Sequence, residues 1–208
     1  MFVYIFFPYK TMKVVIFNIK GGQGKTSLAI NLALTLDAGV VTNDIYSPLE
    51  KVLPDDQFIK VDLNSDFPDI PENNDLFIYD LGGWIDVRAI QLFKEADLII
   101  IPMINNYINN QVTINTIDEI KEYNENILII ANRTKKKDYE EIKDIIQNMY
   151  GNKFPILELK ETTAFDKIFL KEKSIDRIME EDKLLAFSYR GVQKQIKDII
   201  NFINNKRV

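Results

Sequence analysis

Residues 20–27 read Lys-Gly-Gly-Gln-Gly-Lys-Thr-Ser, and the organisation of the chain can be worked out from this segment. An apolar run, Val14–Phe17, comes just before it, and a helical pattern, Ser27–Leu36, begins at its end. Glycines allow a backbone to wrap around an anion without Cβ clashes. The N–H groups of such a loop and of the following helix then face the anion. Strand, loop and helix together predict a phosphate-binding loop.

The side chains of this loop add ligands to those of its backbone. We expect Lys25 to hold the β- and γ-phosphates of a nucleotide, the Thr26 hydroxyl to ligate Mg²⁺ and Ser27 to reach the α-phosphate. The commonest form of the motif requires glycine at position 19, where the chain has Ile19. The expected nucleotide-binding residues here are Gly21, Gly22, Gln23, Gly24, Lys25, Thr26 and Ser27.

From Lys20 to Thr26 the segment matches the pattern K-G-G-x-G-K-[ST] in full. It thereby resembles the deviant Walker A motif of the ParA/MinD family of P-loop ATPases. The resemblance implies ATP and Mg²⁺ as cofactors and slow, partner-stimulated hydrolysis of ATP to ADP and phosphate. It also implies a homodimer with ATP between the subunits, in which Lys20 contacts the phosphates bound by the other subunit. The alternative for Lys20 is an ordinary surface lysine.

Asp44 follows the apolar run Val40–Thr42, where members of that family carry an aspartate, often as Asp-x-Asp. The resemblance implies that Asp44 positions the attacking water or a magnesium-bound water, and it places Lys20, Lys25 and Asp44 in catalysis. Tyr46 stands where the second aspartate would be, which leaves the rate of hydrolysis open. The alternative for Asp44 is a turn residue.

Asp80 ends a second apolar run, Leu76–Tyr79, as the aspartate of a Walker B strand does. At the carboxyl end of its strand it would bind Mg²⁺ through water, which gives Thr26, Asp44 and Asp80 as the expected metal residues. Asp80 and Gly83 also match Asp-x-x-Gly, in which the glycine amide senses the γ-phosphate. Trp84, which follows, is either an aromatic of the switch region or a core residue, and we favour the core.

Asn132 follows the apolar run Ile127–Ala131 and is the expected contact to the base. Guanine-specific relatives have a carboxylate three residues later, which accepts hydrogen bonds from N1 and N2 of guanine. This chain has Lys135 there, a donor that would face those two donors. An asparagine amide can both donate to and accept from the edge of adenine, and the ParA/MinD family uses an asparagine here. The pattern favours ATP over GTP, with a turn residue as the alternative role of Asn132.

Short apolar runs alternate with helical patterns along the chain, which is typical of a doubly wound, mostly parallel sheet flanked by helices. We expect one α/β domain over residues 12–208, with residues 1–11 as an N-terminal extension, and Met1 and Met12 are both possible starts. The expected strands are Val14–Phe17, Val40–Thr42, Phe58–Val61, Leu76–Tyr79, Leu98–Ile101, Ile127–Ala131 and Ile156–Leu159. The expected helices are Ser27–Leu36, Val87–Phe93, Gln111–Tyr123, Tyr139–Met149, Ala164–Lys171 and Lys183–Ile203.

The composition excludes several kinds of chemistry. The 208 residues include no histidine and no cysteine, so there is no disulfide, thiol nucleophile, imidazole metal site or Ser-His-Asp triad. A hydrophobic fraction of 46% is enough for a substantial core. Catalysis would have to use carboxylates, lysines, hydroxyls, backbone amides and a hard cation.

The formal charge is −5, but it is unevenly distributed, because 18 of the 26 lysines and arginines lie beyond residue 104. In ParA-type proteins dimerisation assembles such residues into a surface for nonspecific DNA, whereas solvated helix faces would explain them equally well. The resemblance thus implies plasmid or chromosome segregation, with a ParB-like stimulatory partner. The basic residues in question are Lys135, Lys136, Lys137, Lys167, Lys171, Lys173 and Arg177.

The last helical pattern carries an apolar stripe, for which two roles are open. MinD-type relatives attach to membranes through a C-terminal amphipathic helix, and a membrane-associated positioning ATPase, or a nucleotide-dependent scaffold with little hydrolysis, is the alternative function. We favour a helix docked on the sheet, because the stripe is long enough to be needed by the core and Asp198 is not membrane-seeking. No apolar run is long enough to span a bilayer. The expected location is the cytoplasm, with association with the nucleoid as an open option. The stripe consists of Val192, Ile196, Ile199, Ile200 and Ile203.

Overall fold

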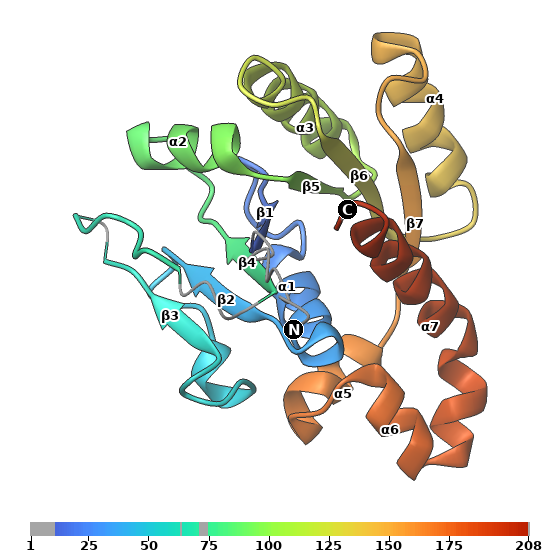
Figure 1. Ribbon diagram of the computed structural model, residues 1–208. Helices are drawn as coiled ribbons and strands as arrows, with labels where there is room; N and C mark the ends of the chain where they lie inside the picture. The colour runs from blue at the N-terminus through green and yellow to red at the C-terminus, as the bar shows by residue number, and fades with distance from the viewer. Residues whose placement is uncertain (1–10, 63, 71–74, 208) are drawn as a thin grey trace, which may run out of the picture.

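The computed structural model describes residues 11–62, 64–70 and 75–207, and within them seven parallel strands form one sheet. The strand order is β3-β2-β4-β1-β5-β6-β7, which places β1 at the centre (Figure 1). The expected α/β fold with a doubly wound parallel sheet is confirmed. The strands are β1 (Met12–Ile16), β2 (Gly39–Thr42), β3 (Phe58–Lys60), β4 (Leu76–Asp80), β5 (Leu98–Met103), β6 (Ile127–Thr134) and β7 (Ile156–Lys160).

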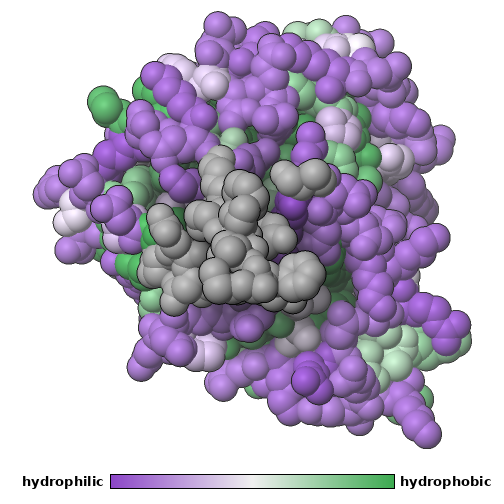
Figure 2. All heavy atoms as spheres, viewed as in Figure 1, coloured by the Kyte–Doolittle hydropathy of each residue, from purple (hydrophilic) through white to green (hydrophobic). Residues whose placement is uncertain are grey.

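Helices cover both faces of the sheet, and this is why the strands are apolar on both sides. Alternate residues of β1 and of the position after it point into two separate clusters: Val14 and Ile16 pack in one, Val15 and Phe17 in the other. The first cluster contains side chains of α1 (Lys25–Leu36), α5 (Ala164–Lys171), α6 (Ile175–Glu181) and α7 (Lys183–Asn204). The second contains side chains of α2 (Val87–Glu95), α3 (Tyr107–Ile120) and α4 (Asp138–Tyr150). The face of the molecule that is seen in Figure 2 is largely hydrophilic outside the grey residues.

All seven expected strands and all six expected helices are present in the part of the chain that the structure describes. Two further elements were not predicted: the short 3₁₀ helix Leu49–Lys51, and α6, whose seven residues are too few to show a helical period. α3 begins at Tyr107 rather than Gln111, because the side chain of Asn106 caps it by accepting a hydrogen bond from the Asn109 amide. Residues 1–10 lie outside the described residues, so the N-terminal extension stays a prediction.

The apolar stripe of α7 packs against the sheet. Val192, Ile196, Ile199 and Ile203 are all buried, and Ile200 packs against the same cluster. The docked helix is therefore confirmed for this stripe. The described residues include no helix long and apolar enough to cross a membrane.

A close approach between β2 and β4 gives a test of this packing. A Cβ at Gly39 would lie 2.4 Å from Cε1 of Phe77. We expect Gly39→Ala to lower the free energy of unfolding by about 1–3 kcal/mol, because the buried ring must shift. Gly191→Ala, in α7, is the matched control: a Cβ there meets nothing within 4 Å, and alanine should add about 0.5–1 kcal/mol of stability. Urea denaturation of both variants measures the difference, and equal effects would contradict the packing.

Candidate functional site

The carboxyl ends of β1, β2, β4 and β6 bring most of the predicted site residues to one edge of the sheet. They surround a pocket of about 370 Å³ above the loop between β1 and α1. Binding at this edge is the general rule for open parallel sheets. The pocket is lined by Gly21, Gly22, Gly24, Lys25, Thr26, Ser27, Asp44, Asp80, Leu81, Gly82, Gly83, Trp84 and Arg133.

The phosphate loop is held open by contacts to two other strands. Gly22 and Gly24 have φ values of 77° and 86°, a conformation that glycine adopts without strain. Gln23, between them, is buried, and its Oε1 accepts a hydrogen bond of 2.8 Å from the Ile104 amide, just after β5. Its carbonyl oxygen accepts one of 2.7 Å from Nδ2 of Asn132, in β6. The loop therefore keeps its shape without help from a ligand.

Asn18, at the end of β1, is a residue that the sequence analysis missed. Its buried Nδ2 donates to the Pro102 carbonyl and to Oγ1 of Thr113, both at 2.9 Å. Its Oδ1 accepts from the Lys20 amide at 2.8 Å, which fixes the start of the loop. The available signal was a polar side chain directly after a fully apolar strand, because such a side chain needs buried partners.

The two lysines of the motif lie in different environments. Nζ of Lys25 turns inward and donates to the carbonyl oxygen of Asn18 at 3.1 Å. Burial lowers the pKa of the Lys25 ammonium, while the carboxylates of Asp80 and Asp44 act in the opposite direction. Lys20 is exposed at the rim of the loop. One lysine is thus placed for a ligand within the pocket, and the other faces outward.

Asp80 is the group in the pocket that most needs a ligand. It is 1% exposed, and its Oδ2 has no hydrogen-bond partner. Burial raises the pKa of Asp80 to about 6, against the opposing effects of a hydrogen bond with Thr26 and of the charge on Lys25. A buried, unsatisfied carboxylate oxygen beside a hydroxyl fits a hard cation such as Mg²⁺. Over residues 11–62, 64–70 and 75–207, no group of three or more acidic residues could hold a metal by itself, so phosphate or water would have to complete the shell.

Asp44 lies in a tight turn that is connected to Asp80. Its Oδ1 accepts a hydrogen bond of 3.0 Å from the Tyr46 amide, and its own amide donates to Oγ1 of Thr42. Thr42 in turn donates to the Asp80 carbonyl at 2.7 Å. The structure thus places Asp44 both in the pocket wall and in a turn, so the two roles considered for it are compatible. Tyr46 is 89% exposed.

The segment after β4 closes the other wall of the pocket. The Gly82 amide donates to Oδ1 of Asn43 at 2.6 Å. A Cβ at Gly83 would lie 2.4 Å from the Ile19 carbonyl oxygen, so only glycine allows this approach to the phosphate loop. The prediction that Trp84 lies in the core was wrong: it is 42% exposed and lines the pocket, with its ring packed against Gly82.

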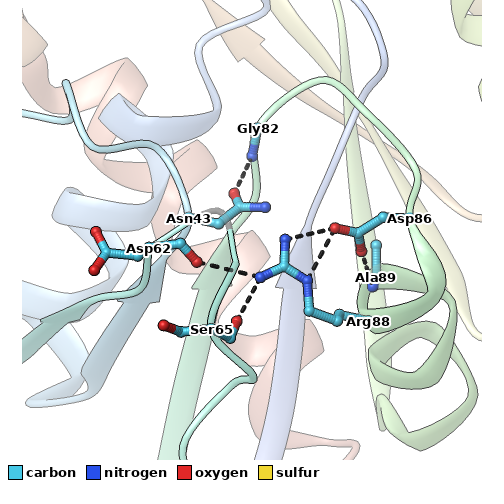
Figure 3. A network of polar contacts seen from close by, with 7 residues as sticks. All are labelled: Asn43, Asp62, Ser65, Gly82, Asp86, Arg88 and Ala89. Carbon is cyan, nitrogen blue, oxygen red and sulfur yellow. Dashed lines mark hydrogen bonds and ion pairs between the residues drawn. The ribbon is translucent and has the colours of Figure 1, made fainter.

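A polar network joins this segment to the loop after β3 (Figure 3). Asp86 caps α2 by accepting a hydrogen bond from the Ala89 amide, and it forms an ion pair with Arg88. Arg88 also donates to the backbone carbonyls of Asp62 and Ser65. A movement of the Gly82–Gly83 segment would therefore reach the carbonyl groups of Asp62 and Ser65 through only a few contacts.

A second pocket, of about 500 Å³, lies on the other side of Gly24 and Ser27. Asn132 lines it, as the prediction of a base site requires. The amide of Asn132, however, supports the phosphate loop through Gln23, and it lies within β6 rather than in a loop after it. Contact between Asn132 and adenine stays a prediction. The further lining residues are Leu28, Arg133, Leu159, Lys160, Glu161, Thr162, Thr163, Phe165 and Asp166.

The unsatisfied oxygen of Asp80 leads to a test on the protein without nucleotide or metal. We expect Asp80→Asn to raise the free energy of unfolding by about 1–3 kcal/mol at pH 8, because it removes a buried charge that lacks a full set of partners. The gain should shrink at pH 5, where the wild-type carboxyl, with its pKa of about 6, is largely protonated.

The measurement is urea denaturation in the presence of a metal chelator. Asp44→Asn is the matched control: Asp44 is half-buried, and its replacement should change stability by less than about 0.5 kcal/mol. A wild-type protein as stable as Asp80→Asn at pH 8 would show that the carboxylate of Asp80 is satisfied by the protein itself.

Comparison with known proteins identifies the fold. No protein-family model and no curated protein sequence matches the chain. Among solved structures, apo McdA from Cyanothece superimposes with a TM-score of 0.65 at 14% identity, over 94% of this chain and 99% of that one. MinD from Pyrococcus horikoshii, complexed with Mg-ADP, superimposes with a TM-score of 0.66 at 15% identity, over 94% of this chain and 98% of that one. A ParA family ATPase from Chlorobium tepidum gives 0.62 at 17% identity, over 91% and 97%. The chain therefore has the fold of the ParA/MinD-type P-loop ATPases.

Proposed function

We propose that this protein is a positioning or partition ATPase, which binds ATP with Mg²⁺, dimerises around it and hydrolyses it slowly. The observation that carries the proposal is the loop with two lysines in different positions. Lys25 points into the pocket, whereas Lys20 is exposed at its rim, where a second subunit can be contacted. McdA, MinD and ParA-family structures with the same fold support the assignment.

The residues of the chain suggest how the reaction is organised. The N–H groups of the loop and of the first turn of α1 would bind the phosphates, and Lys25 would exchange the Asn18 carbonyl for a phosphate oxygen. Thr26 and Asp80 would hold Mg²⁺, which supplies positive charge to the β- and γ-phosphates. Asp44 would orient the attacking water, and Lys20 of a second subunit would add a cation at the γ-phosphate. No histidine is available as a general base, which agrees with slow turnover.

Exposed apolar side chains at the same edge of the sheet as the pocket, with Trp84 in the pocket lining itself, support a face-to-face dimer. They lie in the segments that follow β2, β4 and β5, and because these strands are parallel, the segments meet at one edge of the sheet. Side chains of this size are normally buried, and several together mark an interaction surface. They are Tyr46, Trp84, Val87, Tyr107 and Ile108.

We propose that the dimer binds DNA and that the protein acts in the cytoplasm. A ParB-like partner protein would stimulate ATP hydrolysis. The apolar stripe of α7 is used by the core, so it is not available for a membrane. Three of the basic residues considered for DNA binding are engaged in ion pairs: Lys135 pairs with Glu161, Lys173 with Glu181, and Arg177 with Glu180. DNA binding would depend more on the remaining basic residues, of which Lys167 and Lys171 lie together on α5.

Dimerisation can be tested by light scattering after size-exclusion chromatography. We expect the Asp44→Ala variant, in which hydrolysis is slowed, to elute as a dimer with MgATP and as a monomer with MgADP. Adding Lys20→Ala to it should remove the dimer but keep nucleotide binding, because Lys20 would act in the other subunit. Adding Lys25→Ala should weaken nucleotide binding itself.

Lys51→Ala provides the matched control. Lys51 is also exposed, but it borders a pocket beside the end of α1, far from the phosphate loop. The Asp44→Ala variant that also carries Lys51→Ala should form the dimer with MgATP as the Asp44→Ala variant does. A protein that binds MgATP but stays monomeric would refute the ATP-dependent dimer, and a protein that binds no nucleotide would refute the whole proposal.

DNA binding makes a separate prediction. With MgATP, the affinity for a short duplex of arbitrary sequence should fall steeply as salt is raised, because phosphate contacts release counterions. Fluorescence anisotropy should show weaker binding for Lys167→Gln/Lys171→Gln and unchanged binding for Lys94→Gln, an exposed lysine on α2. Equal binding by all three proteins would point away from this surface.

A further inference from the structure

Arg133 occupies the boundary between the two pockets of the site. Three residues line both pockets: Gly24, Ser27 and Arg133. Arg133 is the one charged side chain among them. We call the pocket of about 500 Å³ that Asn132 lines the outer pocket. A nucleotide with its β- and γ-phosphates above Lys25 and its base in the outer pocket would cross this boundary at the α-phosphate. The side chain that it would pass there is a guanidinium.

The backbone places Arg133 at this boundary through an irregularity in β6. Asn132 is aligned with Leu159 and Thr134 with Lys160, so Arg133 is an extra residue in its strand. Such bulges redirect a side chain, and they are common beside functional sites. Arg133 is accordingly the one exposed residue of β6, whose other seven are buried.

The conformation of Arg133 is unfavourable unless something compensates for it. Its φ is 52°, in the left-handed region that disfavours residues with a long side chain. The Arg133 amide donates to Oδ1 of Asn132 at 3.0 Å, while Nδ2 of Asn132 holds the Gln23 carbonyl. The same asparagine therefore fixes both the phosphate loop and the turn that presents Arg133. Strain of this kind in a site is a reason to look for a function.

The guanidinium has no ion pair or side-chain hydrogen bond within the part of the chain that the structure describes. Glu161, which lines the outer pocket, is paired with Lys135 at 3.0 Å. The five donors of an arginine form a planar fork that matches the oxygens of a phosphate or a carboxylate, and of these a nucleotide carries phosphates.

We propose that Arg133 binds the α-phosphate of the nucleotide held by the same subunit. This inference rests on the proposed function, since it requires that the two pockets hold one nucleotide. Arg133 is then a positioning residue: with Ser27 it fixes the point at which the phosphate chain turns from the loop toward the base. The Asn132–Gln23 contact makes its position dependent on the shape of the loop.

The test is isothermal titration calorimetry of MgATP and MgADP with the wild type, Arg133→Asn and Arg133→Lys. Asparagine tolerates the left-handed conformation but carries no charge. Arg133→Asn should bind both nucleotides roughly ten- to hundredfold more weakly, by the same factor because both contain the α-phosphate. Arg133→Lys should recover part of the loss. The melting temperature of Arg133→Asn without nucleotide should equal or exceed that of the wild type.

A second measurement separates a phosphate contact from a merely structural role. The affinity of the wild type for MgADP should fall more with rising salt than that of Arg133→Asn, because one ion pair is screened. Three results would overturn the inference and leave the proposed function intact: unchanged affinity of Arg133→Asn, a loss for MgATP alone, or a loss that lysine does not reduce and salt does not affect. A wild type that binds neither nucleotide would overturn both.

Discussion

The pocket depends on three buried polar side chains that hold a loop with few backbone contacts of its own. Asn18 and Gln23 lie in the loop between β1 and α1, Asn132 lies in β6, and each is almost fully buried. Between them they bind the loop to the ends of β5 and β6. Buried amides are costly unless they are hydrogen-bonded, and here the partners are backbone groups of the loop and of its neighbours. The cradle is thereby shaped before any phosphate arrives, so little ordering cost is left for binding.

The two walls of the pocket are connected to each other and to the surface. Thr42 ties the turn with Asp44 to Asp80, and Asn43 holds the Gly82 amide. The close approach of Gly83 to Ile19 means that a ligand that moves the phosphate loop must also move the segment after β4. Asp86 and Arg88 extend this connection to the loop after β3. These contacts give the proposed ATP cycle a physical route from the phosphates to the exterior.

The sequence predicted the elements well where local pattern is decisive. Strands such as Leu98–Ile101 are continuous apolar runs because both faces are covered, and the glycine-rich loop has few alternatives between a strand and a helix. Pattern failed for Trp84, since an aromatic residue after a glycine pair can pack on either side of a loop. The pattern also gave no sign that the side chain of Gln23, at the variable position of the motif, is buried as an anchor. The bulge at Arg133 left no trace in the periodicity of its strand.

The chain alone thus specified the parallel sheet, the phosphate loop and the set of oxygen and nitrogen ligands, because these follow from short-range spacing and from the absence of histidine and cysteine. The folded molecule specified which of these groups meet. In it, Oδ2 of Asp80 has no hydrogen-bond partner and the side chain of Lys25 points inward. Asn132 binds the phosphate loop, and Arg133 lies at the boundary of two pockets. One of these relations joins residues 109 positions apart, Gln23 and Asn132. These relations arise from strand order and burial, which no local sequence pattern encodes.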